Sequence, residues 1–107
     1  MYLYHEHANI AAAGVDTWTY TNSTGSTIHL EQILSSASGE LKVTLLTGPG
    51  GSETTKAVVF TTKGSLIANV PFSEPLTVLN GQNILITVKN TDKGSMDIHS
   101  FINGFYE

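Results

Sequence analysis

The feature that most constrains the fold is a period-two alternation of apolar and polar side chains, which recurs in short runs along the chain. The runs Leu41–Leu45 and Ile84–Val88 show it most clearly. Alternation at this period places one set of side chains on each face of a β-strand, and the middle of the chain has no segment with the period of a helix. Gly-, Asn-, Ser- and Pro-rich turns separate the runs at intervals of about 8–12 residues. We therefore expect an all-β protein, an antiparallel β-sandwich of jelly-roll type or a small barrel, with seven to eight short strands.

The Asn80-Gly81 pair is the strongest turn signal in the chain. It lies between the strand-like runs 76–79 and 84–89. Asn-Gly is preferred in type I′ turns, whose twist matches that of two antiparallel strands. The sequence therefore predicts a hairpin at this point.

Length, charge and cysteine content exclude several classes of function. A chain of 107 residues forms one domain with a single modest core, and the absence of cysteine excludes disulfides and thiolate sites. The net charge is −4 and the five basic residues are all lysines, so no guanidinium is present to recognise phosphate or base edges. No run of about 18 apolar residues and no apolar leader is found. We expect no nucleic-acid partner, no membrane span and no secretory signal.

Residues 1–13, reading MYLYHEHANIAAA, differ in composition from the rest of the chain. The segment is aromatic and histidine-rich and then alanine-rich, whereas clear alternation begins only at Asp16. We expect an N-terminal arm over residues 1–13, ordered by docking on the domain or on a neighbouring subunit, and one β-sandwich domain over residues 14–107. The arm supplies the candidate partner contacts Tyr2, Leu3, Tyr4, His5, His7 and Ile10.

His5 and His7 form the most prominent candidate metal motif. On an extended chain both imidazoles project to the same side, which is a spacing that metal ligands use. A cupin-like site would also need a Glu a few residues further on and a second His motif after a Pro-x-Gly turn. Residues 8–14 carry no carboxylate, and no His lies shortly after the turn at 48–51. We therefore expect no metal and no cofactor, and keep a small cupin-like metalloprotein as the third hypothesis for function.

The C-terminal strand contains the residue types of a hydrolase without the motif of one. Asp97 and His99 share one face of an expected strand, and Ser100 follows directly. A hydrolase needs a nucleophile, a base and an orienting carboxylate together, and no Gly-x-Ser-x-Gly elbow marks a nucleophile here. We expect no catalytic residue and no enzymatic activity, with His29 and His99 at the surface or in an interface.

Trp18 and Tyr20 lie on one face of the first strand of the expected domain, between threonines. Large aromatic side chains usually supply core area in a small sandwich, and this is the interpretation that we favour. The same pair is also suited to stacking on sugar rings, with hydroxyls from the 14 Thr and 10 Ser of the chain as hydrogen-bonding groups. A carbohydrate- or receptor-binding β-sandwich is therefore the alternative function.

The second half of the chain carries a family resemblance. Its strand Leu79–Val88 reads LNGQNILITV, Asn90-Thr91-Asp92 follows, and the chain ends at Ile102–Glu107 with INGFYE. This pattern, within residues 57–107, resembles the ends of small β-sandwich decoration, or cement, proteins on the capsids of tailed bacteriophages. The resemblance implies a structural virion protein on the capsid surface, assembled in the host cytoplasm as trimers that bridge neighbouring major capsid subunits.

Overall fold

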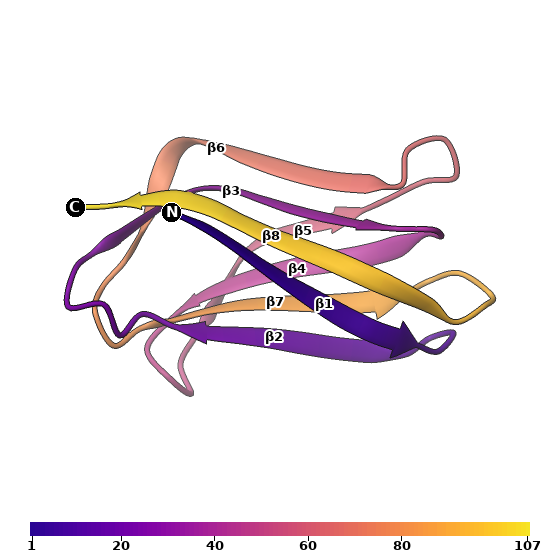
Figure 1. The fold of residues 1–107 in the computed structure, drawn as a ribbon, viewed down its shortest axis with the longest axis horizontal. Coiled ribbons are helices and arrows are strands. Elements are labelled where there is room, and N and C mark those ends of the chain that lie inside the picture. The colour runs from indigo at the N-terminus through magenta and orange to yellow at the C-terminus, as the bar shows by residue number, and fades with distance from the viewer.

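A computed structural model describes all of residues 1–107 as eight antiparallel strands in two packed sheets (Figure 1). The first sheet has the order β1-β8-β3-β6 and the second the order β2-β7-β4-β5. This is the strand order of a jelly roll, so the prediction of an antiparallel β-sandwich of this type with seven to eight strands is confirmed. The structure has no helix with the length and apolarity that crossing a membrane requires. The strands are β1 (Tyr2–Ile10), β2 (Val15–Thr21), β3 (Ile28–Ala37), β4 (Leu41–Gly48), β5 (Thr54–Phe60), β6 (Ile67–Val78), β7 (Asn83–Asn90) and β8 (Met96–Tyr106).

The core lies between the two sheets and contains 14 buried apolar residues. Every second residue of β4 and of β7 is buried, as the alternation in both runs predicts. Burial of a large aliphatic side chain stabilises the fold by about 1.5–3 kcal/mol, so these inward faces hold the sheets together. The largest contributors from the facing sheet are Ile28, Leu30, Ile33, Ile98 and Ile102.

The segment that we expected as an arm is the edge strand β1 of the first sheet. It pairs with β8 from Tyr2 opposite Asn103 to Ile10 opposite Met96. The terminal ammonium of Met1 donates to the carbonyl oxygen of Gly104 at 2.6 Å and fastens the beginning of the strand. Side chains in this segment alternate between the interior and solvent, and that period, rather than the unusual composition, decides its structure.

The Asn80-Gly81 turn connects the two sheets instead of two paired strands. β6 pairs with β3, whereas β7 pairs with β2 and β4, so the predicted hairpin is wrong. The amide of Gln82 donates to the carbonyl oxygen of Leu79 at 3.0 Å, and Gly81 alone of the two central residues has a positive φ, 89°. This is a type II pattern, not type I′. Both flanking runs bury one face, but they do so from opposite sides of the core.

A β-bulge in β3 determines which of its side chains lie on the outer face of the first sheet. Leu30 and Ile33 are both buried although they are three positions apart, which requires one extra residue between them. The register shifts accordingly between Leu30 and Gln32 against both neighbouring strands. On β8 a side chain at Gly104 would collide with the carbonyl oxygen of His29, so the close approach of the strands requires glycine there.

Candidate functional site

Aromatic side chains gather on the outer face of the first sheet. Tyr2 and Tyr4 project outward from β1, and His99 and Phe101 do so from the neighbouring strand β8. The centroid of the Phe101 ring lies 5.7 Å from that of Tyr2 and 5.0 Å from that of Tyr4, and the Tyr4 ring stacks on His99 at 5.9 Å. We call these four residues the outer aromatic face.

A cavity of about 280 Å³ opens on the outer aromatic face, lined by Tyr2, Gln32, Leu34, Phe101 and Asn103. Strand register brings these residues together, because Asn103 is opposite both Tyr2 and Gln32. The Gln32 amide donates to the side-chain oxygen of Asn69, which fixes its orientation. None of the lining residues is charged. The cavity thus combines apolar rings with amides that can both donate and accept hydrogen bonds.

The other two cavities have a different character. One, of about 320 Å³, lies against the loop after β4, includes Lys56 and has Leu76 as its only apolar lining residue. The other, of about 180 Å³, adjoins Asp92 and Met96. Neither is lined by an aromatic ring. Only the cavity on the outer aromatic face can therefore stack against a ligand.

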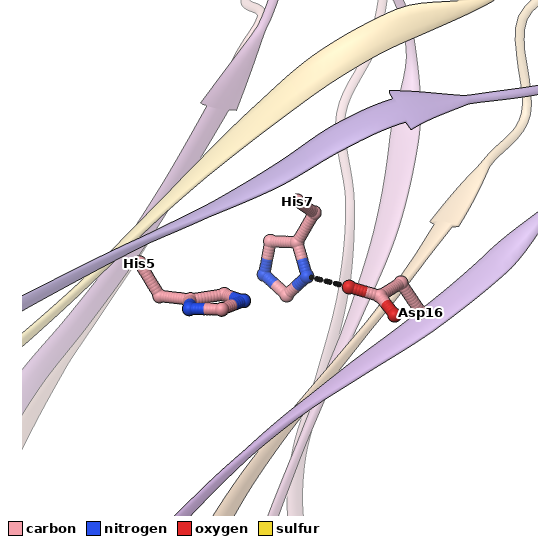
Figure 2. A group of neighbouring side chains, drawn as sticks. All are labelled: His5, His7 and Asp16. Atoms are coloured by element: carbon pink, nitrogen blue, oxygen red, sulfur yellow. Dashed lines mark hydrogen bonds and ion pairs between the residues drawn. The ribbon is translucent and has the colours of Figure 1, made fainter.

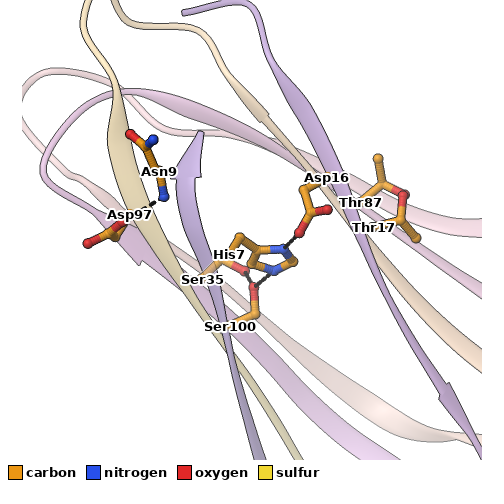
Figure 3. Close-up of polar contacts among 8 residues, drawn as sticks. All are labelled: His7, Asn9, Asp16, Thr17, Ser35, Thr87, Asp97 and Ser100. Atoms are coloured by element: carbon orange, nitrogen blue, oxygen red, sulfur yellow. Dashed lines mark hydrogen bonds and ion pairs between the residues drawn. The ribbon is translucent and has the colours of Figure 1, made fainter. Parts of the chain in front are cut away.

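A second group of polar residues lies between the sheets, and we call Asp16, His7, Ser100 and Ser35 the inter-sheet cluster. His7 Nδ1 lies 2.7 Å from Asp16 Oδ2 and His7 Nε2 lies 3.0 Å from Ser100 Oγ, which in turn lies 2.8 Å from Ser35 Oγ (Figure 3). An ionised carboxylate only accepts, so Nδ1 carries the proton and Nε2 accepts from Ser100. His7, Ser35 and Ser100 have no solvent-exposed surface. Every buried side-chain nitrogen and oxygen atom of the cluster has a hydrogen-bond partner.

Burial determines the charge of His7. It lowers the pKa of the imidazole, and this effect outweighs the hydrogen bond to Asp16, which raises the pKa. The ring is therefore neutral at neutral pH. A neutral imidazole keeps one nitrogen as a donor and one as an acceptor, which is what its two partners require.

The inter-sheet cluster is connected like a Ser-His-Asp triad, but its serine hydroxyl is not accessible to a substrate. Carboxylate, imidazole and hydroxyl follow in the order of a hydrolase. However, Ser100 has no exposed surface, its oxygen is held between His7 and Ser35, and it lines none of the three cavities. A substrate carbonyl cannot approach this oxygen. We interpret the cluster as part of the interior.

His5 and Trp18 extend the cluster towards the open edge between β1 and β2. The His5 ring stacks on Trp18 with centroids 5.1 Å apart, and it meets the His7 ring in a T-shaped arrangement with centroids 4.8 Å apart. Figure 2 shows the His5 ring directed at His7, with Asp16 beyond. Trp18 and Tyr20 are half-buried on the inward face of β2 and pack against the core, the arrangement that we favoured for them.

The structure divides the candidate partner contacts of the N-terminal segment between two faces. Tyr2 and Tyr4 are exposed, whereas Leu3, His5, His7 and Ile10 point inward. Asp97 and His99 share a face, as expected, but it is the face opposite to Ser100. They bond elsewhere: Asp97 accepts from the Asn9 amide, and His99 bonds to the Tyr4 hydroxyl.

Sequence reasoning missed the inter-sheet cluster. Its signal was the alternation in residues 2–7, which places His5 and His7 on the same face as Leu3. The His5 and His7 motif lacked a carboxylate in residues 8–14, and the structure supplies one from Asp16, just beyond the turn at 11–14. Ser35 and Ser100 are paired across β3 and β8, and no local pattern indicates that pairing.

No protein-family model matches this chain, and no curated protein matches it. Among solved structures, the crystal structure of PirA (Photorhabdus insect-related toxin A) matches with a TM-score of 0.55 over 97% of this chain and 93% of that chain, at 10% sequence identity. The chain has a PirA-like fold. A likeness at this identity shows the fold alone.

The match to PirA overturns the resemblance to phage decoration proteins. PirA is a β-sandwich toxin component and not a capsid protein, so the expectation of a virion protein that bridges capsid subunits is wrong. The motif that carried the resemblance is a turn followed by an alternating strand, which corresponds here to the crossing into β7. β-Sandwiches of many functions contain such a segment, and the fold does not determine the function.

Proposed function

We propose that this protein is a non-catalytic recognition module that binds neutral carbohydrate on the outer aromatic face. The observation that carries the proposal is the cavity of about 280 Å³, in which the rings of Tyr2 and Phe101 lie beside the amides of Gln32 and Asn103. The buried position of Ser100 supports the absence of catalysis, because the one triad-like hydroxyl of the chain cannot reach a substrate.

The chemistry of the lining residues favours a sugar. A sugar ring presents an apolar C–H face, which packs on an aromatic ring, and a rim of hydroxyls, which both donate and accept hydrogen bonds. Gln32 and Asn103 provide donors and acceptors together. Because no charged side chain lines the cavity, a neutral saccharide fits better than a phosphorylated or acidic one. A fully apolar ligand would leave the Asn103 amide and the side-chain oxygen of Gln32 without partners in the ligand.

The size of the cavity indicates one sugar residue at a time. Small-molecule sites usually have volumes of about 300–1,000 Å³, so this cavity is at the lower end. About 12 heavy atoms at about 0.3 kcal/mol each correspond to a Kd of about 1–3 mM for a monosaccharide. Tight attachment to a glycosylated surface then needs several sites acting together, because linked weak sites gain affinity by effective concentration.

Titration calorimetry with neutral mono- and oligosaccharides tests this proposal, after a glycan array has chosen the ligand. Phe101→Ala removes the central ring, and Gln32→Ala removes a hydrogen-bonding amide. Loss of one stacked ring weakens binding by about 1 kcal/mol, or about fivefold. We expect each variant to bind the chosen saccharide at least fivefold more weakly than the original chain.

Two control variants locate the site. Phe60 is exposed on β5, in the other sheet, so Phe60→Ala should leave binding unchanged. Trp18→Phe keeps an aromatic ring in the core and tests the alternative platform of Trp18 and Tyr20. Binding that survives Phe101→Ala but not Trp18→Phe would move the site to that edge. An array on which no neutral glycan binds would overturn the proposal.

A further inference from the structure

We propose that His5, His7 and Asp16 form a site for one Zn²⁺ ion or a similar divalent transition metal, at the open edge of the sandwich. One ligand atom from each residue lies within 4.8 Å of the other two (Figure 2). The site is separate from the outer aromatic face, because the three side chains point to the inward side. It does not depend on carbohydrate binding.

The donor atoms suit this class of metal. Imidazole nitrogen and carboxylate oxygen are ligands of Zn²⁺, with bonds of about 2.0–2.2 Å. In a tetrahedral site, two such ligand atoms are about 3.3 Å apart. His7 Nδ1 and Asp16 Oδ2 are 2.7 Å apart, so they need to separate by only about half an ångström. Asp16 keeps 43% of its side chain exposed, which leaves an entry path for the ion and a fourth position for water.

The inter-sheet cluster can accept the metal without leaving a buried group unpaired. The ion takes the place of the proton that Nδ1 shares with Asp16, and the imidazole changes tautomer, so that its one proton is now on Nε2 and the ring stays neutral. Nε2 then donates to Ser100 Oγ, 3.0 Å away. Ser100 turns its own hydroxyl towards Ser35, which is 2.8 Å away. Histidine ligands typically donate their second nitrogen to a partner of this kind.

The position of the site gives it a role in the fold. β1 is an edge strand of the first sheet and β2 is an edge strand of the second, and the two strands are not paired in one sheet. The hydrogen bond from His7 to Asp16 is a side-chain link between them. An ion held by His5 and His7 from β1 and by Asp16 from β2 ties the two edges together. A ligand that binds only the folded state raises stability by mass action, so we expect metal to raise the melting temperature.

Trp18 provides a direct measurement. It is the single tryptophan of the chain, and the His5 ring stacks on it. Chelator-treated protein without an affinity tag is titrated with CoCl₂ and CuCl₂, which quench a nearby indole, and then with ZnCl₂ as competitor. We expect quenching that saturates at one equivalent, a tetrahedral Co²⁺ absorption spectrum, reversal of the Co²⁺ quenching by Zn²⁺ and a higher melting temperature with Zn²⁺.

Four variants test the assignment of the ligands and of the outer partner. Asp16→Asn keeps an acceptor for His7 but loses the carboxylate, and His5→Phe keeps the stacking on Trp18 but loses the nitrogen. Both should weaken metal binding at least tenfold. His99→Gln is the control, because His99 faces outward and is bonded to Tyr4. Ser100→Ala should weaken binding by about tenfold through loss of the outer partner.

The proposal fails on any of three results. The stripped protein takes up no metal, or Asp16→Asn and His5→Phe bind it as well as the original chain, or His99→Gln abolishes binding and so places the ion on the outer face. A variant that does not fold is recognised by its far-ultraviolet circular dichroism spectrum. The Co²⁺ spectrum of the unsubstituted chain then decides, because it distinguishes nitrogen and oxygen ligands in tetrahedral geometry from an ion bound only by water.

Discussion

The outer aromatic face and the inter-sheet cluster share the strands β1 and β8, yet the two regions have opposite surroundings. Alternate residues of this strand pair contribute to both, so Tyr4 and His99 project to solvent while His7 and Ser100 project inward to meet Asp16 from β2 and Ser35 from β3. Each region contains a hydroxyl–imidazole hydrogen bond, of 2.7 Å outside and 3.0 Å inside. Polar groups on the outer aromatic face can exchange a hydrogen-bond partner for a ligand. The buried polar groups of the inter-sheet cluster have no other molecule within reach to replace a lost partner.

The largest difference is expected on truncating one residue from each region. His7→Ala leaves a cavity and removes the partner of buried Ser100, so it should lower the free energy of unfolding by about 3 kcal/mol or more. Tyr2 is 65% exposed, and Tyr2→Ala should lower it by less than about 1 kcal/mol. Urea unfolding in the presence of chelator, followed by Trp18 fluorescence, measures both. Equal losses would show that the two regions do not differ in their contribution to stability.

This comparison also explains which parts of the molecule the sequence could predict. Alternation in β4 and β7 predicted the inward faces, because the period of a strand is a local property. Contacts between strands are not local: Asp16 and Ser100 meet His7, and Ser35 meets Ser100, only through the jelly-roll strand order. The hairpin prediction from Asn80-Gly81 was wrong for the same reason. A turn sets the local bend of the chain and does not decide which sheet the next strand joins.

The outer aromatic face was predictable in part. Tyr2 and Tyr4 were selected from composition, and the structure leaves both exposed. Phe101 lies on the outward face that alternation in β8 gives it, but no local pattern indicates that it meets Tyr2 and Tyr4. Gln32 was not selected, because the bulge at Glu31 changes the face to which later residues of β3 point. A strict period-two count across that bulge would place Gln32 on the inward side with Leu30, so the cavity could not be assembled from the sequence.

A smaller effect is expected within the inter-sheet cluster itself. Ser100→Ala leaves His7 Nε2 without a donor and Ser35 without its partner, so we expect a loss of about 2 kcal/mol in the free energy of unfolding. Ser35→Ala removes only the last link and should lower it by about 1 kcal/mol. The double variant should lose less than the sum, because both single variants remove the same hydrogen bond and the Ser35 hydroxyl that Ser100→Ala leaves unpaired is absent from the double variant. Unfolding experiments on the two single variants and the double variant measure this coupling. Additive losses would mean that the four residues do not act as one hydrogen-bonded chain.

The smallest effect is expected at the hydrogen bond between Tyr4 and His99, which is the exposed counterpart of the buried bond between Ser100 and His7. Tyr4→Phe deletes the hydroxyl that lies 2.7 Å from His99 Nδ1, a shorter separation than the one between Ser100 and His7. Tyr4 is nevertheless 50% exposed, so water replaces the lost partner, and we expect the free energy of unfolding to change by less than about 0.5 kcal/mol. The same urea titration measures it. A loss as large as that of Ser100→Ala would indicate that the outer aromatic face is held by its own hydrogen bonds. Its rings would then be less free to meet a ligand, and the difference between the two regions would no longer rest on exposure.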